Sequence, residues 1–198
     1  MIALLDYGAG NLRSVENALR AVGAEVVVTR DPAVVRRAAR LVVPGQGSMR
    51  ACGDAMRASG CADALVEAVR AGTPTLGICV GLQMLFDEGE EHGGARGLGL
   101  VPGKIARLPS TVKLPHIGWS PVRATPACHP LFRPLDGEYV YFAHSFAAPA
   151  GARGAALLAE HGEPYCAALA DGNLFAVQFH PEKSQKVGLA LLERFVKV

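Results

Sequence analysis

The chain has 198 residues, of which 50% are hydrophobic and 19% are charged, and its mean hydropathy is +0.22. This composition excludes a disordered chain and predicts one domain, residues 1–198, with a well-buried core. The net charge is only +2, no stretch is strongly basic, and aromatic residues make up 6% of the chain. We therefore expect no binding of nucleic acid, which needs a basic surface or stacking side chains.

The first apolar stretch, residues 2–5, is too short for a signal peptide or a membrane span, and no basic segment precedes it. The chain has five cysteines, an odd number, and no two of them form a Cys-x-x-Cys pair. They are Cys52, Cys61, Cys79, Cys128 and Cys166. This usage is typical of a reduced protein and provides neither a disulfide framework nor a zinc site. We expect a cytoplasmic protein that needs no membrane, metal or cofactor.

Short apolar runs alternate with helical stripes through the first half of the chain. A glycine turn at residues 8–10 and an N-cap at Asn11 separate the first strand from the first helix. Buried strands are predicted at residues 2–5, 25–29, 41–43 and 75–78. Helices are predicted at residues 12–22, 32–40, 49–71 with a break near Gly60, and 81–86. Apolar strands that alternate with helices indicate a parallel sheet covered by helices on both faces.

Glycine and proline become frequent after residue 89, and long helical stripes disappear. Strands are predicted at residues 104–108, 139–143, 155–159 and 174–179, followed by a closing helix from about Ser184. Strands that follow one another without helices between them favour antiparallel pairing. We therefore predict an α/β fold with a mixed, mainly parallel sheet, helices on both faces and an antiparallel extension.

Cys79 lies at the end of the fourth predicted strand, in the sequence Gly-Ile-Cys-Val-Gly of residues 77–81. A residue between a strand and a helix, flanked by glycines, is typical of a nucleophile elbow, where larger neighbours would crowd the nucleophile. The start of the helix contributes partial positive charge that favours a thiolate, and its N–H groups can bind an oxyanion. The alternative, which we expect for the other four cysteines, is a small side chain packed in the core. The two glycines favour a nucleophile at Cys79.

The sequence Phe-His-Pro-Glu of residues 179–182 offers a base for this thiol. Pro181 keeps His180 extended, and in an extended segment His180 and Glu182 project to the same side. A histidine oriented by a carboxylate activates a nucleophilic thiol. The alternative for His180 alone is a hydrogen-bonded histidine at a strand end. Together with Cys79, the pair predicts a Cys-His-Glu triad.

A glycine-containing loop, Pro-Gly-Gln-Gly at residues 44–47, follows the third predicted strand. Neighbouring parallel strands end at the same edge, so we expect this loop to face Cys79 and to turn backbone N–H groups toward an oxyanion. Its alternative is an ordinary turn between a strand and a helix. The glycines of residues 7–11 lack the full Gly-x-Gly-x-x-Gly pattern, so no dinucleotide site is predicted.

These motifs resemble the class I, triad-type glutamine amidotransferases. The resemblance rests on Gly-Ile-Cys-Val-Gly-Leu-Gln at residues 77–83 and His-Pro-Glu-Lys-Ser at residues 180–184. Further stretches are similar to the glutaminase subunits of imidazole glycerol phosphate synthase, from histidine biosynthesis: residues 6–15, 44–47, 113–119 and 141–146. The motifs run from the first strand to the last helix, so the resemblance covers essentially the whole chain and implies a flavodoxin-like core.

The resemblance implies that Cys79 attacks the side-chain amide of glutamine and forms a glutamyl thioester. It implies that His180 passes a proton to the leaving ammonia and later activates water, while Glu182 holds its tautomer. It also implies a set of substrate-binding and oxyanion residues: Gly45, Gln46, Gly47, Val80, Gln83, Glu91, Ser145 and Phe146. For Glu91 the alternative is a solvated charge in the acidic run of residues 87–91.

In this family the ammonia passes to a cyclase subunit with a (β/α)₈ barrel, which makes imidazole glycerol phosphate and an aminoimidazole carboxamide ribotide. The resemblance therefore implies a heterodimer with that cyclase. Trp119, Tyr141 and Lys183 match positions that face it. The alternative for Trp119 and Tyr141 is packing in the core.

Two positions depart from the family pattern. Gln46 stands between two glycines where valine is usual, and Met49 stands where an aromatic residue is common. We expect both to affect the gating of the glycine loop, and we expect a side-chain hydrogen bond of Gln46 to hold its resting state.

Two other functions are compatible with the same residues. One is an independent cysteine hydrolase, or an amidotransferase that serves purine or anthranilate synthesis, which the motif of residues 7–15 disfavours. The other is a flavodoxin-like binding module in which Cys79 is only packed. A glutamine-analogue electrophile separates the enzymes, which it labels at Cys79, from the binding module.

Overall fold

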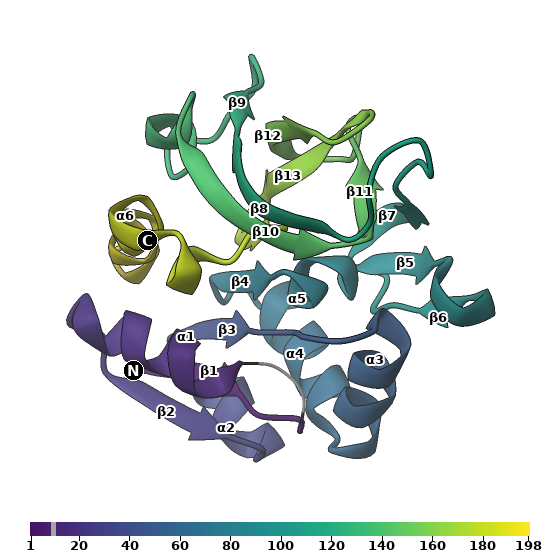
Figure 1. Cartoon of the computed structure of the whole chain (residues 1–198). Helices are drawn as coiled ribbons and strands as arrows, with labels where there is room; N and C mark the ends of the chain where they lie inside the picture. The colour runs from purple at the N-terminus through teal and green to yellow at the C-terminus, as the bar shows by residue number, and fades with distance from the viewer. Residues whose placement is uncertain (9–10) are drawn as a thin grey trace.

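Five parallel strands form the centre of the protein, whose computed structural model describes residues 1–8 and 11–198 (Figure 1). Their order across the sheet is β2 (Val26–Thr29), β1 (Ile2–Leu5), β3 (Arg40–Val43), β4 (Thr75–Ile78) and β14 (Leu174–Val177). Every residue of β1, β4 and β14 is buried because helices cover both faces, which explains their almost uninterrupted apolar sequences. The centre of the predicted glycine turn, residues 9 and 10, lies outside the described residues.

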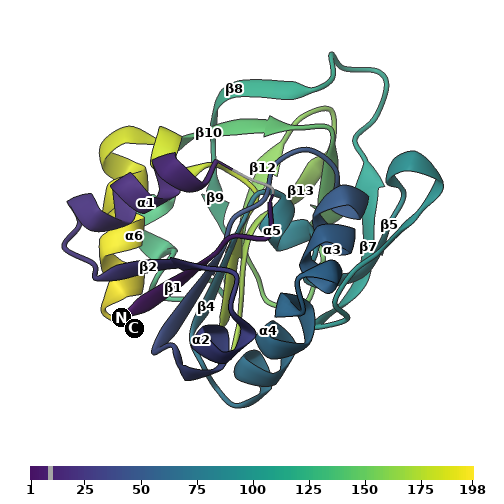
Figure 2. The same cartoon turned by 90° about the horizontal axis from the view of Figure 1, so that it is seen from below.

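Helices cover the two faces of this parallel sheet (Figure 2). On one face α1 (Leu12–Ala21) packs against α6 (Gln185–Val196), and on the other α4 (Cys61–Arg70) packs against α2 (Pro32–Arg37) and α3 (Met49–Ala58). Gly60, with a left-handed φ of 73°, separates α3 from α4 at the break that the sequence predicts. Within residues 1–8 and 11–198, no helix combines the length and the apolar character that a membrane crossing requires.

The sheet continues beyond β14 into the mixed half of the fold. From β14 outward the strands are β13 (Pro164–Asp171), β11 (Phe146–Pro149), β7 (Val101–Arg107), β5 (Phe86–Gly89) and β6 (Ala95–Arg96). β12 (Ala155–Glu160) pairs with β13 and carries the short β9 (Arg123–Ala124). All of these pairs are antiparallel except β5 with β7. The predicted mixed, mainly parallel sheet with an antiparallel extension is confirmed.

A separate antiparallel pair, β8 (His116–Pro121) with β10 (Tyr139–His144), lies over the carboxyl end of β14. The N–H of His180, which follows β14, donates to the carbonyl of Tyr141 in β10 over 2.9 Å. The prediction that residues 139–143 belong to the extension of the main sheet is therefore wrong. The ladder partner of β10 is β8, a strand that alternation alone does not reveal because it is mostly exposed or half-buried.

Two predicted helices are longer than the observed ones. The helix expected at residues 81–86 is α5 (Val80–Gln83), because the next residues turn into the sheet, where the N–H groups of Leu98 and Leu100 donate to the carbonyls of Met84 and Leu85. Helix α2 ends at Arg37 rather than at residue 40, because Arg40 pairs with Ile2 at the start of β3. In both places pairing with distant residues overrides the local pattern.

We expect Gly81→Ala to destabilise the fold. A Cβ atom at this position would lie 2.0 Å from the carbonyl oxygen of Val43 in β3, so the backbone has to move. An overpacked site of this kind costs about 1–3 kcal/mol of unfolding free energy. Urea unfolding measures the loss, with Gly151→Ala as the control, since a Cβ there meets no atom within 4 Å. Equal urea midpoints for the two variants would contradict the proposed close packing.

Candidate active site

Cys79 occupies the tight turn between β4 and α5. Its backbone has φ 56° and ψ −112°, a conformation that residues with a side chain rarely adopt. The surrounding backbone holds it there: the N–H of Cys79 donates to Val177 of β14 over 2.8 Å, and its carbonyl accepts from Leu82 over 3.0 Å. The predicted strand–nucleophile–helix arrangement is therefore present, with the strain typical of a nucleophile elbow.

The glycines around Cys79 are needed for contacts within the backbone rather than for space around the thiol. A Cβ on Gly77 would lie 2.9 Å from the carbonyl oxygen of Gly81, and a Cβ on Gly81 would collide with Val43. The expectation that larger residues at these positions would crowd the nucleophile itself is therefore wrong. The glycines allow the turn, β3 and α5 to approach one another.

The partial positive charge that the start of α5 contributes near the thiol is smaller than the sequence predicts. Helix α5 has only four residues, so its macrodipole is small. What the helix start does provide is two N–H groups, those of Val80 and Gly81, which have no acceptor among the described residues. These groups are available to an oxyanion formed at Cys79.

His180 and Glu182 form a buried pair beside Cys79. Nδ1 of His180 lies 2.8 Å from Oε1 of Glu182, whose side chain is 1% exposed, and His180 lines the same cavity as Cys79. His180 is extended before Pro181, as predicted, with φ −99° and ψ 98°. The expected extended path to Glu182 is wrong, however, because Pro181–Lys183 form a 3₁₀ turn that brings the carboxylate back to the imidazole.

The pKa of His180 reflects two opposing effects. Burial lowers the pKa, but the hydrogen bonds to Cys79 and Glu182 outweigh burial and raise the pKa from 6.5 to about 9. At neutral pH the imidazole therefore carries its proton between a sulfur and a carboxylate. This arrangement is suited to a thiol that reacts as a thiolate and to a leaving group that must be protonated.

A cavity of about 290 Å³ opens at Cys79 and His180. Most of the predicted substrate and oxyanion residues line it: Gln46, Gly47, Val80, Gln83, Glu91, Ser145 and Phe146. Pro115, Ala143, His144 and Lys183 complete the wall. The volume lies at the small end of the range for ligand pockets, which is appropriate for a single amino acid.

The glycine loop packs directly on the elbow. A Cβ on Gly45 would lie 2.6 Å from the backbone nitrogen of Gly81, so only glycine permits this approach. Beneath the loop, the hydroxyl of Tyr7 donates to the carbonyl of Pro44, and Sγ of Cys52 lies 3.3 Å from the carbonyl oxygen of Gln46 and donates to it. The loop is thus held from below by Tyr7, to which the sequence assigns no role, and by Cys52, for which it predicts only packing in the core.

Gln46 itself does not hold the loop. Its side chain is exposed and makes no hydrogen bond within residues 1–8 and 11–198. The expectation of a side-chain hydrogen bond that stabilises a resting state is wrong, since the bond to the loop runs from Cys52 to the main chain of Gln46. It is therefore the main-chain carbonyl of Gln46, not its amide side chain, that bonds to the protein beneath the loop.

Two polar side chains face the cavity with defined partners. Oε2 of Glu91 accepts from the N–H of Met49 over 2.8 Å, and the side chain of Glu91 is only 17% exposed, so the alternative of a solvated charge is wrong. Nε2 of Gln83 donates to the carbonyl of Phe146 over 2.8 Å and to Oε1 of Gln178 over 3.1 Å. Both N–H groups of Gln83 are therefore occupied.

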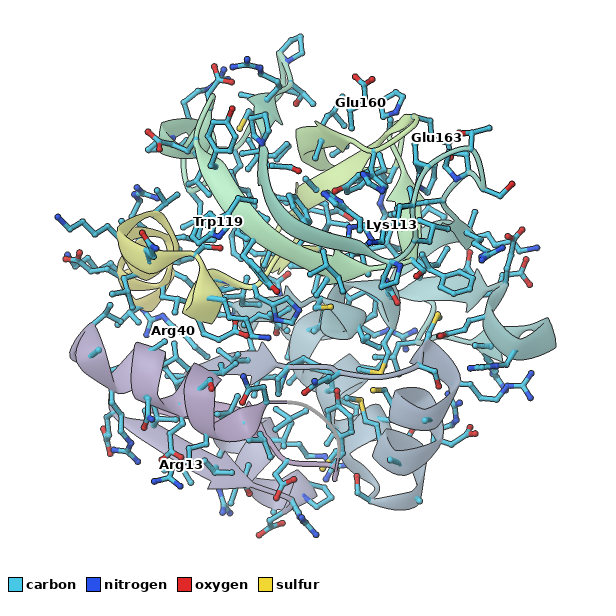
Figure 3. The ribbon with its side chains drawn as sticks, in the orientation of Figure 1. Arg13, Arg40, Lys113, Trp119, Glu160 and Glu163 are labelled. Carbon is cyan, nitrogen blue, oxygen red and sulfur yellow. The ribbon has the colours of Figure 1, made fainter. Side chains whose placement is uncertain are left out.

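The residues assigned to a partner surface lie together. Trp119 of β8 and Tyr141 of β10 pair across the strands, with ring centroids 6.1 Å apart, and Nζ of Lys183 lies 5.6 Å from the Tyr141 ring centroid. Trp119 is 43% exposed, so the alternative of core packing is wrong for this residue (Figure 3). Lys183 also lines the cavity, so this cluster borders the site.

One buried polar residue next to the nucleophile is not predicted from the sequence. Gln178 is fully buried, and its Nε2 lies 3.8 Å from Sγ of Cys79. The sequence feature that could have identified Gln178 is its polar side chain within the apolar run of residues 174–179. Burial of an amide there is costly unless it is hydrogen-bonded.

His144 lines the cavity and has a structural role there. Its Nδ1 lies 2.9 Å from the carbonyl oxygen of Phe146, and its Nε2 lies 3.3 Å from the hydroxyl of Tyr165. Burial lowers the pKa of His144 to about 3. The imidazole therefore stays neutral and supports the wall at Phe146.

Comparison with known proteins places this geometry in a family. The chain matches the family "Glutamine amidotransferase class-I" over residues 3–198. It is similar to a crystal structure of a glutamine amidotransferase with a TM-score of 0.78 and 21% identity, covering 100% of this chain and 99% of that one, which shows a shared fold. The mixed sheet described above is thus the fold of these enzymes.

Closer relatives carry the name "Imidazole glycerol phosphate synthase subunit HisH". The protein from Syntrophotalea carbinolica is 46% identical and covers 98% of both chains. The protein from Nitrosomonas europaea is also 46% identical, over 99% of this chain and 97% of its own. The alternative of a binding module in which Cys79 is only packed is wrong, since Cys79 lines the cavity of an amidotransferase fold. The chain therefore belongs to the class-I glutamine amidotransferase family, among the HisH subunits of imidazole glycerol phosphate synthase.

Proposed function

We propose that this chain hydrolyses glutamine to glutamate and ammonia at Cys79 and delivers the ammonia to a cyclase subunit. The observation that carries the proposal is that Cys79 and His180 line a cavity of amino-acid size, with the imidazole held by the buried carboxylate of Glu182. The HisH relatives favour this function over amidotransfer in purine or anthranilate synthesis. The whole chain, residues 1–198, acts as one domain, and its five free cysteines suit the reducing cytoplasm.

The reaction uses the proton that His180 holds. The Cys79 thiolate attacks the amide carbon of glutamine, and the carbonyl oxygen becomes an oxyanion that accepts from the N–H of Val80 and from the glycine loop. The C–N bond then breaks as His180 gives its proton to the nitrogen, which leaves as ammonia. Neutral His180 next removes a proton from water, and the hydroxide attacks the thioester. Glutamate leaves and the sulfur recovers its electron pair.

Glu91 and Gln83 bind the amino-acid end of the substrate. The carboxylate of Glu91 attracts the α-ammonium group, and its bond to the N–H of Met49 fixes its position. Gln83 offers its oxygen, since both of its N–H groups already have acceptors. The backbone around Ser145 and Phe146, with Gly47 opposite, encloses the side chain of glutamine.

The outer face of β8 and β10 binds the cyclase, a (β/α)₈ barrel, in a heterodimer. This face exposes large apolar side chains, with Ile117 63%, Trp119 43% and Tyr139 57% exposed, and an exposed apolar cluster of this kind is typical of a protein interface. It borders the cavity through Lys183. Ammonia released into water becomes ammonium and loses its nucleophilic lone pair, so a closed interface is necessary for synthesis of imidazole glycerol phosphate and the aminoimidazole carboxamide ribotide.

Cys79→Ala is expected to abolish glutamine-dependent synthesis by the complex while synthesis from added ammonium salts continues. The thiol takes part only until ammonia is released, so external ammonia bypasses it. The measurement is the rate of product formation with each nitrogen source. Persistent glutamine-dependent activity in this variant would refute the nucleophile at Cys79, and loss of both activities would indicate a damaged complex.

The raised pKa of His180 predicts a loss of stability at alkaline pH. A pKa that rises from 6.5 to about 9 on folding stabilises the folded protein fully below pH 6.5, and this contribution disappears as the pH passes through 9. The urea midpoint of the wild type is expected to fall over this interval, and that of His180→Gln to fall less. Unfolding curves at a series of pH values test this, and parallel declines would show that His180 gains no proton affinity on folding.

Gating of the glycine loop is expected to depend on Cys52 more than on the side chain of Gln46. Removal of one oxyanion donor lowers a rate by about 10²–10³, so we expect the lone subunit to be slow and the partner with its ligand to accelerate it by about that factor. Cys52→Ala frees the Gln46 carbonyl, which raises the basal rate and reduces stimulation. Gln46→Val is expected to change the basal rate and the stimulation by less than about two-fold, because an exposed side chain contributes little to the stability of the loop.

Glutamate release with and without the cyclase and its ligand measures both quantities for each variant. Alkylation of Cys79 serves as the control for an intact site. Full activity of the lone wild-type subunit would exclude gating, and a larger effect of Gln46→Val than of Cys52→Ala would reverse the assignment.

A further inference from the structure

A buried row of hydrogen-bonded amide groups leads from the cavity wall to the nucleophilic sulfur. The carbonyl of Phe146 accepts from Nε2 of Gln83 over 2.8 Å, and the same nitrogen donates to Oε1 of Gln178 over 3.1 Å. Nε2 of Gln178 then lies 3.8 Å from Sγ of Cys79. The exposed fractions of Gln83 and Gln178 are 3% and 0%, so neither amide exchanges its partners for water.

The donor and acceptor chemistry of these groups sets the direction of every hydrogen bond in this row. A backbone carbonyl only accepts, so Gln83 presents its NH₂ group to Phe146. The second N–H of that group points to Gln178, which therefore presents its oxygen to Gln83. The NH₂ group of Gln178 is left facing the sulfur of Cys79, toward which it can only donate.

The main chain fixes Gln178 in this position, outside the reach of substrate. Its backbone N–H donates to the carbonyl of Ala167 in β13 over 2.9 Å, which extends the ladder by one residue beyond β14. The cavity at Cys79 is lined by Gln83, whereas Gln178 lies behind the sulfur. An amide is costly to bury unless it is hydrogen-bonded. Within residues 1–8 and 11–198, the NH₂ group of Gln178 has one acceptor, the sulfur of Cys79.

We infer that Gln178 is a further catalytic residue, which donates an N–H···S hydrogen bond to the Cys79 thiolate, and that Gln83 is a positioning residue that sets the direction of this bond. The inference deepens the proposed function and rests on it. A donor stabilises a charged sulfur more than a neutral one, so Gln178 favours the thiolate before attack. It acts again when the C–S bond of the thioester breaks and the sulfur leaves with the electron pair.

The test is the pH dependence of alkylation of the full chain by iodoacetamide, with the adduct at Cys79 quantified by peptide mapping. Gln178→Met keeps the size of the side chain and removes the donor. A hydrogen bond to a charged group is worth about ten-fold or more in an equilibrium, so alkylation at pH 7 is expected to fall by about ten-fold, with the profile displaced to higher pH. Gln178→Glu places a carboxylate at the sulfur and is expected to displace the profile further.

A matched control separates this effect from damage to the sheet. Thr75→Val removes a buried side-chain hydrogen bond at the opposite end of β4 and is expected to leave the alkylation profile unchanged. With the cyclase and its ligand present, Gln178→Met is expected to lower kcat for glutamine while KM stays within about two-fold, since the substrate does not touch Gln178.

Alkylation profiles that coincide for Gln178→Met and the wild type would overturn the inference. If Gln178→Met does not fold, Gln178→Glu decides the question, because it preserves the shape and the acceptor for Gln83, and an unchanged profile again overturns the inference. Failure of the proposed function is recognised separately, as glutamine turnover that survives Cys79→Ala. Alkylation reports on the sulfur alone and is independent of the substrate.

Discussion

The close approach of three backbone segments at Cys79 is the constraint on which the rest of the site depends. Gly81 lies against the carbonyl of Val43, and Gly45 lies against Gly81, at separations that no Cβ atom would permit. This packing holds Cys79 at φ 56° and brings the glycine loop over the N–H groups at the start of α5. The strain is local, and the apolar strands on both sides supply the stability that sustains it.

Burial gives the site its electrostatic character. Removal from water disfavours charge on His180, yet the hydrogen bonds to Cys79 and Glu182 raise its pKa to about 9. Each member of the set is thus stabilised by the others, and removal of one leaves a buried group without its partner. The amide of Gln178 also lies beside the sulfur, so the segment that follows β14 supplies the nucleophile with two polar neighbours, Gln178 and His180.

The β8–β10 strand pair carries the exposed apolar face on its outer side and supports the cavity wall from its inner side. The outer side of β8 and β10 carries Trp119 and Tyr141, whereas the inner side carries His116, which lies 3.1 Å from the hydroxyl of Tyr165. The same hydroxyl meets His144, whose other nitrogen supports the cavity wall at Phe146. Burial lowers the pKa of His116 to about 4, so these contacts remain neutral at physiological pH. The β8–β10 pair that carries the exposed apolar face is therefore joined to the cavity wall at Phe146 by a short set of hydrogen bonds.

The sequence by itself determined the parallel core and the placement of Cys79 and His180, because apolar strands, a strand-to-helix turn and the residue before proline act through local geometry. It placed Glu182 on an extended path, whereas the structure has a 3₁₀ turn there. It did not determine the partner of β10, the length of α5 or the roles of Tyr7, Cys52 and Gln178. Those features arise from contacts between residues far apart in the chain, such as Cys79 and Gln178, which are separated by 99 positions in the sequence. A local pattern records which side chains are buried, but only the tertiary structure decides which polar groups meet there, since each buried donor takes the acceptor that folding brings to it.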